Sequence, residues 1–178
     1  MVPAQGSPTA QPGDHRVFLG LGSNLGDRRL NLQRAIHLLG ETMKVERISS
    51  VYDTAPMLVV DQPRFLNLVC LVTTELAPEE LLLQLKSIEH KLGRVAGPRF
   101  GPRLIDIDLL LYDELIFESP SLTVPHPRIP ERAFVLLPLS ELVPTLQHPV
   151  LHTEIAALAQ AVSHTGVDKL GPLFTPTA

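Results

Sequence analysis

The chain has 178 residues, of which 44% are hydrophobic and 4% aromatic, and it carries a formal net charge of −4. This length suits one domain with an aliphatic core, and the acidic balance argues against non-specific attachment to nucleic acid or to an anionic membrane surface. The single cysteine, Cys70, excludes an internal disulfide framework, and no apolar stretch is long enough for a signal peptide or a membrane span, so we expect a cytoplasmic protein.

The first part of the chain predicts a tail, a strand and a helix. Residues 1–15 are rich in Pro, Ala, Gln and Gly and predict a disordered tail. Residues 16–22 predict a buried strand, followed by a glycine-rich turn at residues 22–26. Asp27 is a natural cap for a helix with apolar residues at helical spacing, which ends at Gly40.

Two further strands precede a second helix. Residues 44–52 are rich in β-branched side chains and predict a strand. A proline-containing loop at residues 53–64 leads into another strand at residues 65–74. The second helix begins near Pro78, with acidic residues in its first turn, and ends at Gly93.

The remaining part completes the core and adds to it. A Gly- and Pro-rich loop at residues 94–103 precedes a strand at residues 104–112. The resulting order, β-α-β-β-α-β, is typical of ferredoxin-like α+β folds with a mainly antiparallel sheet. A short strand at residues 115–117 and helices near residues 131–137 and 153–163 would follow this core.

The sequence contains no internal repeat and no interdomain linker. We therefore expect a single domain over residues 16–165. Residues 1–15 and a C-terminal tail at residues 166–178 would flank this domain, and we expect both tails to be dispensable.

Two acidic residues interrupt the apolar strand at residues 104–112. Asp106 and Asp108 are two positions apart, so their side chains share one face, with Cα atoms about 7 Å apart. Neighbouring carboxylates resist desolvation unless a cation offsets their charge, and Mg²⁺ suits such hard oxygen ligands. An edge strand with a solvated polar face is the alternative. The opposite face would carry Ile105, Ile107, Leu109 and Leu111.

Arginine residues flank the carboxylate pair in the sequence. They are Arg94, Arg99, Arg103, Arg128 and Arg132. Guanidinium groups match phosphate oxygens bidentately, and acidic metal ligands beside arginines are the working parts of phosphoryl transfer. Each arginine taken singly is more often a solvated surface residue.

Two other patterns point to no chemistry of their own. The glycine run at residues 20–26 resembles a dinucleotide fingerprint, but its last glycine falls one residue late, and no Gly-Lys-Ser/Thr follows. We interpret it as a tight strand-to-helix turn. His148 and His152 have an i, i+4 spacing, but Pro149 and the lack of a nearby third ligand argue against zinc.

Residues 99–110, which read RFGPRLIDIDLL, closely resemble the signature of the 6-hydroxymethyl-7,8-dihydropterin pyrophosphokinases. Other segments resemble this family in the same order, and they are residues 20–26, 52–56, 61–67, and 124–127 with 132–134. The resemblance covers residues 17–144. It implies a diphosphokinase of folate biosynthesis, which transfers pyrophosphate from ATP to the hydroxymethyl group of the reduced pterin and releases AMP.

The resemblance also implies roles for individual residues. Those implied to be catalytic are Arg94, Arg103, Asp106 and Asp108, with the two aspartates holding two Mg²⁺ ions that bridge the ATP phosphates. Those implied to bind the pterin are Thr54, Ala55, Met57, Phe65, Asn67 and Phe134, with the two phenylalanines stacking on its ring. Those implied to bind ATP are Glu89, Arg94, Arg99, Phe100, Arg103, His126 and Arg132. The family further implies a monomer whose partners are ATP and the pterin. From the acidic balance we expect no nucleic-acid partner and no membrane partner.

Two alternative functions belong to other classes. A ferredoxin-like module can bind RNA through exposed aromatic residues in basic surroundings, but this chain has few aromatic residues and an acidic balance. A metal-dependent phosphohydrolase would use the same carboxylates and arginines with water as the acceptor. A flat stacking pocket, which Phe65 and Phe134 would supply, distinguishes a pterin acceptor from water.

Overall fold

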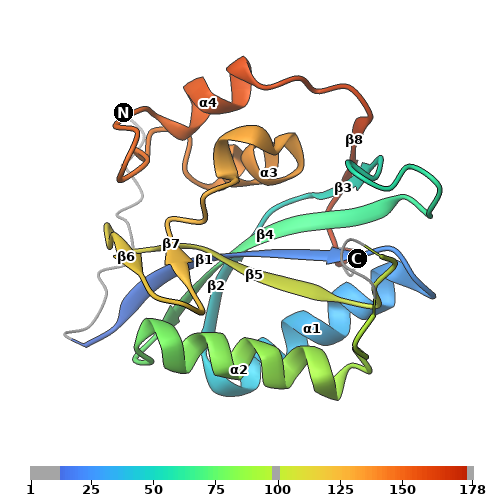
Figure 1. Ribbon diagram of the computed structural model, residues 1–178, viewed down its shortest axis with the longest axis horizontal. Coiled ribbons are helices and arrows are strands. Elements are labelled where there is room, and N and C mark those ends of the chain that lie inside the picture. Colours follow the sequence, from blue (N-terminus) through green and yellow to red (C-terminus); the bar gives the residue numbers. More distant parts are fainter. Residues whose placement is uncertain (1–12, 98–100, 176–178) are drawn as a thin grey trace.

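The computed structural model describes residues 13–97 and 101–175, so Arg99 and Phe100 lie outside the described residues. Within these ranges a six-stranded sheet forms the centre of the molecule, and all its strand pairs are antiparallel. Helices lie on both faces of this sheet (Figure 1). No helix in the described part of the chain combines the length and apolar character needed to cross a membrane.

The elements follow the expected order with additions. The sheet consists of β1 (His15–Ser23), β2 (Lys44–Ile48), β3 (Val51–Thr54), β4 (Phe65–Thr74), β5 (Asp106–Tyr112) and β8 (Val167–Gly171). The helices are α1 (Arg28–Thr42), α2 (Pro78–Lys91), η1 (Ile129–Glu131), α3 (Ala133–Leu142) and α4 (Ile155–Ala161). A small hairpin, β6 (Phe117–Glu118) with β7 (Thr123–Val124), forms a second, two-stranded sheet.

The apolar periodicities of the sequence produce two cores, one on each side of the sheet. Strand β1 alternates, so that Val17, Leu19 and Leu21 pack under α1 and α2, while Phe18 packs under α3 and α4. The helix pairs accordingly cover opposite faces (Figure 1). Helix α1 begins as expected, because the Asp27 side chain accepts a hydrogen bond from the Leu30 N–H at 3.0 Å.

One predicted strand is two strands in the structure. Residues 44–52 divide into β2 and β3, which both pair with β4, with Ile48 opposite Cys70 and Tyr52 opposite Asn67. Ser49 causes the interruption, because its hydroxyl accepts the Val69 N–H at 2.9 Å and donates to the next carbonyl. A side-chain hydrogen bond thus replaces part of the backbone ladder.

The prediction of a C-terminal tail from residue 166 is wrong for β8. This strand pairs with the outer edge of β3, and Leu173 beyond it is 2% exposed in the core under α1. Arg29 of α1 donates to the carbonyls of Pro172 and Leu173 at 3.0 and 2.8 Å. The short polar stretch resembles a tail in sequence, but it satisfies a sheet edge that is otherwise open.

Leu111 also differs from its predicted position. It lies with Leu110 in the core under α3 and α4, whereas Ile107 and Leu109 lie in the opposite core. The register between β1 and β5 shifts between Phe18 and Leu19, which face Leu111 and Leu109. This irregularity ends the strict alternation, but it leaves Asp106 and Asp108 on one face.

Candidate active site

The two aspartates lie on β5, which in the described part of the chain pairs only with β1. Asp106 is opposite Gly22, and Asp108 is opposite Gly20. The Ile107 side chain between them is buried in the core under α1 and α2. Both carboxylates therefore stand on the α3 side of the sheet, next to strand positions that carry no side chain.

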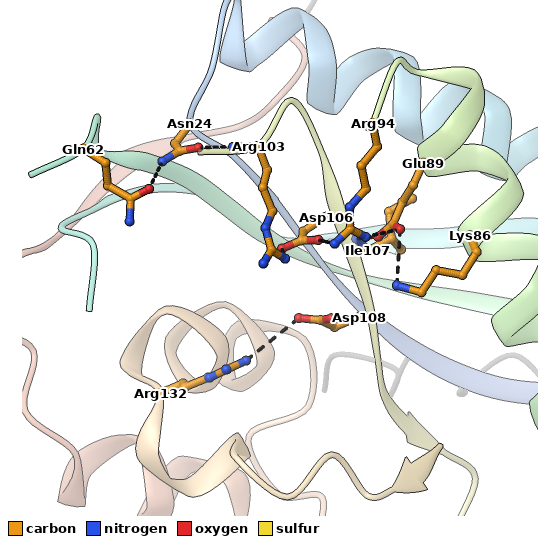
Figure 2. A network of polar contacts seen from close by, with 10 residues as sticks. All are labelled: Asn24, Gln62, Lys86, Glu89, Arg94, Arg103, Asp106, Ile107, Asp108 and Arg132. Atoms are coloured by element: carbon orange, nitrogen blue, oxygen red, sulfur yellow. Dashed lines mark hydrogen bonds and ion pairs between the residues drawn. The ribbon is translucent and has the colours of Figure 1, made fainter. Parts of the chain in front are cut away.

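Two arginines form ion pairs with the carboxylate of Asp106. Arg103 Nη1 lies 2.6 Å from its Oδ2 atom, and Arg94 Nη2 lies 3.1 Å from its Oδ1 atom (Figure 2). The three side chains are only a quarter exposed. Although β5 is an edge strand, its polar face is part of a charge cluster rather than simply solvated.

Asp108 has a different environment. Its nearest arginine contact is Arg132, whose Nη1 atom lies 3.9 Å from Oδ2 (Figure 2). Desolvation, together with the negative charge of Asp106, raises the pKa of Asp108. Because a cation would offset this unfavourable charge, the pair of carboxylates fits Mg²⁺, which completes its shell with water and phosphate oxygens. Within the described residues no group of three or more His, Cys, Asp or Glu could hold a metal.

Glu89 supports this cluster from α2, on the face of the sheet opposite α3. It is 1% exposed on α2, and its Oε1 atom accepts the N–H of Ile107, the residue between the aspartates, at 2.7 Å. Its Oε2 atom pairs with Arg94 and lies 3.3 Å from Lys86 Nζ (Figure 2). One buried carboxylate therefore positions both the strand backbone and an arginine.

A cavity of about 270 Å³ opens beside the carboxylates. Its walls include all the residues predicted to bind the pterin, which are Thr54, Ala55, Met57, Phe65, Asn67 and Phe134. They also include Arg103, Asp106, Asp108, His126 and Arg132 from the predicted metal and ATP sets. The tertiary structure thus brings together segments that are distant in sequence.

Glycines form the floor of this cavity, a feature that the sequence analysis missed. Gly20 and Gly22 line it from within β1, not from the turn that follows. A Cβ atom on Gly22 would lie 2.5 Å from Oδ1 of Asn67. Asn67 itself donates to the Thr54 hydroxyl at 2.7 Å. The absence of a side chain at Gly22 therefore keeps a polar edge accessible between β1 and β3.

A second cavity, of about 440 Å³, lies beside the first. Glu89 and Arg94 line it with Lys86, and Arg103 lines both cavities. The residues predicted to bind ATP are therefore divided between the two cavities. His126 and Arg132 line the first, Glu89 and Arg94 line the second, and Arg103 lines both. Asp106 lines the first cavity, and its carboxylate contacts Arg103, which lines both cavities, and Arg94, which lines the second.

His126 is held as a neutral imidazole. Its ring Nδ1 atom accepts the backbone N–H of Arg128 at 3.1 Å, and the backbone N–H of His126 donates to the Leu110 carbonyl at 2.9 Å. Burial, with the positive charges of Arg132 and Arg128, lowers the pKa of His126 to about 4. At neutral pH its proton therefore lies on Nε2, where it can be donated.

Asn24 joins three segments of the site and was not identified from the sequence. Its backbone N–H and side-chain Oδ1 pair with the carbonyl and the N–H of Arg103 at 3.0 and 2.7 Å. Its Nδ2 atom donates to Gln62 Oε1 at 3.0 Å (Figure 2). The same atom also donates to the Pro63 carbonyl at 3.1 Å. The only signal in the sequence was an asparagine within the glycine-rich turn.

Comparison with known proteins identifies the family of the chain. The family model described as 7,8-dihydro-6-hydroxymethylpterin-pyrophosphokinase (HPPK) matches residues 18–144. The chain is 43% identical over 134 residues to the 2-amino-4-hydroxy-6-hydroxymethyldihydropteridine pyrophosphokinase of Aquifex aeolicus, which covers 75% of this chain and 84% of that protein. It is 48% identical over 136 residues to the mitochondrial folate synthesis bifunctional protein of Pisum sativum, which covers 76% of this chain and 26% of that protein.

The fold is also found in a solved structure. An HPPK-DHPS structure from Plasmodium falciparum superposes with a TM-score of 0.70 at 19% identity, covering 83% of this chain and 45% of that one. The expected ferredoxin-like fold is thereby confirmed. The chain spans 20% to 26% of the length of the longer folate-synthesis relatives that it matches. The chain belongs to the 7,8-dihydro-6-hydroxymethylpterin-pyrophosphokinase (HPPK) family.

Proposed function

We propose that the chain transfers pyrophosphate from ATP to the hydroxymethyl group of 6-hydroxymethyl-7,8-dihydropterin, a step of folate biosynthesis. The observation that carries this proposal is a single cavity with two kinds of wall. Phe65, Phe134 and Asn67 line it together with Asp106 and Asp108. A pocket with aromatic and amide walls suits a flat heterocyclic acceptor. A hydrolase, whose acceptor is water, would not require such a pocket.

The pterin binds at the aromatic end of the cavity in this proposal. Phe65 at the start of β4 and Phe134 on α3 stack on the two faces of the ring. Arg132, whose guanidinium carbon lies 5.5 Å from the centre of the Phe134 ring, supports that wall. The Asn67–Thr54 pair and the backbone around Ala55 and Met57 supply hydrogen bonds to the edge of the ring.

Asp106 and Asp108 would hold two Mg²⁺ ions. When bound, the ions neutralise phosphate charge and orient the triphosphate. Arg94 and Arg103 then transfer their hydrogen bonds from Asp106 to phosphate oxygens, because guanidinium groups bind both anions with similar geometry. Glu89 keeps Arg94 and the β5 backbone in place during this exchange.

The reaction is an in-line displacement at phosphorus. The hydroxymethyl oxygen forms a bond to the β-phosphorus of ATP as it loses its proton to solvent. The bond between the β-phosphorus and the oxygen that bridges to the α-phosphorus breaks, so AMP leaves with that oxygen. Arg103 and Arg132 stabilise the charge that develops, and the Nε2–H of His126 donates on the nucleotide side.

We further propose a monomer in the cytoplasm whose partners are these two small molecules. The pea relative carries the description mitochondrial, so the location stays a prediction. Size-exclusion chromatography with light scattering tests the monomer, and fractionation of the source cells tests the location.

The decisive experiment is to mix the full chain with Mg²⁺, ATP and the pterin alcohol and to identify the nucleotide product. AMP that appears only when the pterin is present is the expected result. ADP with free phosphate would indicate a hydrolase or an ordinary kinase. No turnover, with the fold intact by circular dichroism, would favour a binding module.

A further inference from the structure

Arg64 connects three segments of the chain beside the proposed pterin pocket. Its Nε atom donates to Asp53 Oδ1 at 2.6 Å. Its Nη2 atom lies 3.2 Å from each of three oxygens, namely the Asp53 carbonyl, the Gly166 carbonyl and Asp168 Oδ2. One guanidinium therefore joins the end of β3, the start of β4 and the turn that leads into β8.

The same turn also contacts Ala55 directly. The Ala55 N–H donates to the Gly166 carbonyl at 2.9 Å. Gly166 has a φ of +74°, and a Cβ atom there would lie 3.0 Å from the Ala55 Cβ atom. Only glycine accommodates both this backbone conformation and this close approach.

The residues next to these anchors line the cavity. Asp53 precedes Thr54 and Ala55, Arg64 precedes Phe65, and Thr54 pairs with Phe65 across β3 and β4. The Arg64 side chain is directed instead at Asp53 and β8, and it is 41% exposed. It can therefore fix the spacing of two pocket walls without touching a ligand between them.

The contacts of Arg64 restrict the relative positions of these segments more than an ordinary surface ion pair would. An exposed pair by itself contributes little to stability, and Asp168 is 75% exposed. The Asp53 carboxylate is 24% exposed, however, and two carbonyl acceptors come from different segments. A planar fork that satisfies several acceptors at once restricts their relative positions more than a single contact does.

We propose that Arg64 is a positioning residue for pterin binding and that β8, through Gly166, is the support against which it holds Thr54, Ala55 and Phe65. This inference rests on the proposed function. It gives the segment at residues 166–171 a role in substrate affinity as well as in closing a sheet edge. We call Asp53, Arg64 and Gly166 the brace. None of the described residues that line the second cavity, which include Arg94 and Glu89, belongs to it, so we expect a larger effect on the pterin than on ATP.

The test compares Arg64→Ala, Arg64→Lys and Gly166→Ala with a control, Arg29→Ala, in the full chain. Arg29 also anchors the C-terminal segment, but through Pro172 and Leu173 against α1. Each variant is measured for the KM of the pterin, the KM of ATP and kcat. Amide hydrogen exchange at Ala55 is followed in the free protein by NMR.

We expect Arg64→Ala to raise the KM of the pterin about tenfold, with the KM of ATP within about twofold of the original. Gly166→Ala should act in the same direction, and Arg64→Lys should recover part of the loss, since it keeps the charge opposite Asp53 but not the fork. Exchange at the Ala55 amide should accelerate in Arg64→Ala and Gly166→Ala. Arg29→Ala should change neither the pterin KM nor this exchange rate.

The following outcomes would contradict the proposed positioning role of Arg64. An unchanged pterin KM with unchanged Ala55 exchange would overturn it, as would an equal rise in both KM values, which indicates a general structural role. If Arg64→Ala does not fold, Arg64→Lys and Gly166→Ala must still raise the pterin KM alone. If the original chain forms no AMP, the proposed function fails, and the exchange rate at Ala55 by itself decides whether the brace exists.

Discussion

A Cβ atom on Gly22 would lie 2.5 Å from Oδ1 of Asn67, so no side chain fits between β1 and β4 at this point. Gly22 faces Asn67 on one side and Asp106 on the other. It therefore separates the carboxylate cluster from the polar edge of the pocket. In the proposed reaction, the two substrates would meet in the space above this glycine.

Gly22→Ala is expected to raise the KM of the pterin about tenfold, because Asn67 must rotate away from the Thr54 hydroxyl to avoid the methyl group. The matched control is Gly20→Ala on the same strand and face. The nearest atoms to a Cβ atom there belong to the flexible Leu110 side chain, the closest at 3.4 Å. Steady-state kinetics with each substrate varied checks this, and equal effects of the two substitutions would contradict it.

Arg103→Ala is expected to bind Mn²⁺, a probe for Mg²⁺, severalfold more tightly than the original chain in the absence of nucleotide. Arg103 and Arg94 contact both carboxylate oxygens of Asp106 and so compete with a cation. Turnover should fall in the same variant, since the phosphates lose a guanidinium.

Electron paramagnetic resonance of free Mn²⁺ measures this binding. Arg47→Ala is the control, because Arg47 donates to the Leu142 carbonyl and not to the carboxylate cluster. Unchanged or weaker Mn²⁺ binding by Arg103→Ala would show that the arginines do not compete with the metal.

Asp108→Ala is expected to lower AMP formation by at least about 100-fold while leaving the melting temperature unchanged or higher. The side chain is 43% exposed, and its carboxylate lies beside that of Asp106, so the core does not depend on it. Asp113→Ala should instead lower the melting temperature and leave AMP formation unchanged. Asp113 accepts the Arg16 N–H at 2.8 Å and pairs with His15 at 2.7 Å, outside both cavities.

Activity and thermal melting of both variants give the comparison. If Asp108→Ala kept near-normal turnover, the proposed metal ligand would be wrong. If it lost its fold, the carboxylate would have a structural role that its exposure does not indicate.

His126 is expected to show no protonation between pH 8 and 5. Burial and the neighbouring arginines lower its pKa to about 4, whereas in the unfolded chain a histidine titrates at about 6.5. The folded state therefore binds this proton less tightly than the unfolded state. The stability from this site is complete above the unfolded pKa and is lost as pH falls toward 4.

Proton NMR titration of the ring checks the pKa, with His126→Gln used to assign the signal. The same variant should lose less stability than the original chain between pH 6.5 and 4, as followed by thermal melting. A ring signal with a midpoint near the unfolded value would contradict the buried, neutral imidazole.

Much of the fold could be predicted from the sequence, because its elements depend on local spacing. The apolar repeat of α1, with Asp27 before it, defined a helix in advance. Alternation in β5 placed Asp106 and Asp108 on one face, and the structure agrees. The family resemblance selected Thr54, Phe65, Asn67 and Phe134 from among ordinary core residues, and all of them line one cavity.

Only the tertiary structure decided which distant residues meet. The pairing of β8 with β3, the contact of Asn24 with Arg103 and Gln62, and the absence of a side chain at Gly22 next to Asn67 depend on atoms from separate segments. No periodicity records such contacts, because a hydrogen bond depends on position in space and not on spacing along the chain. By itself the sequence determined most of the elements, the carboxylate pair and the family resemblance. The packing of the sheet decided the division into β2 and β3, the addition of β8 and how the pocket is held.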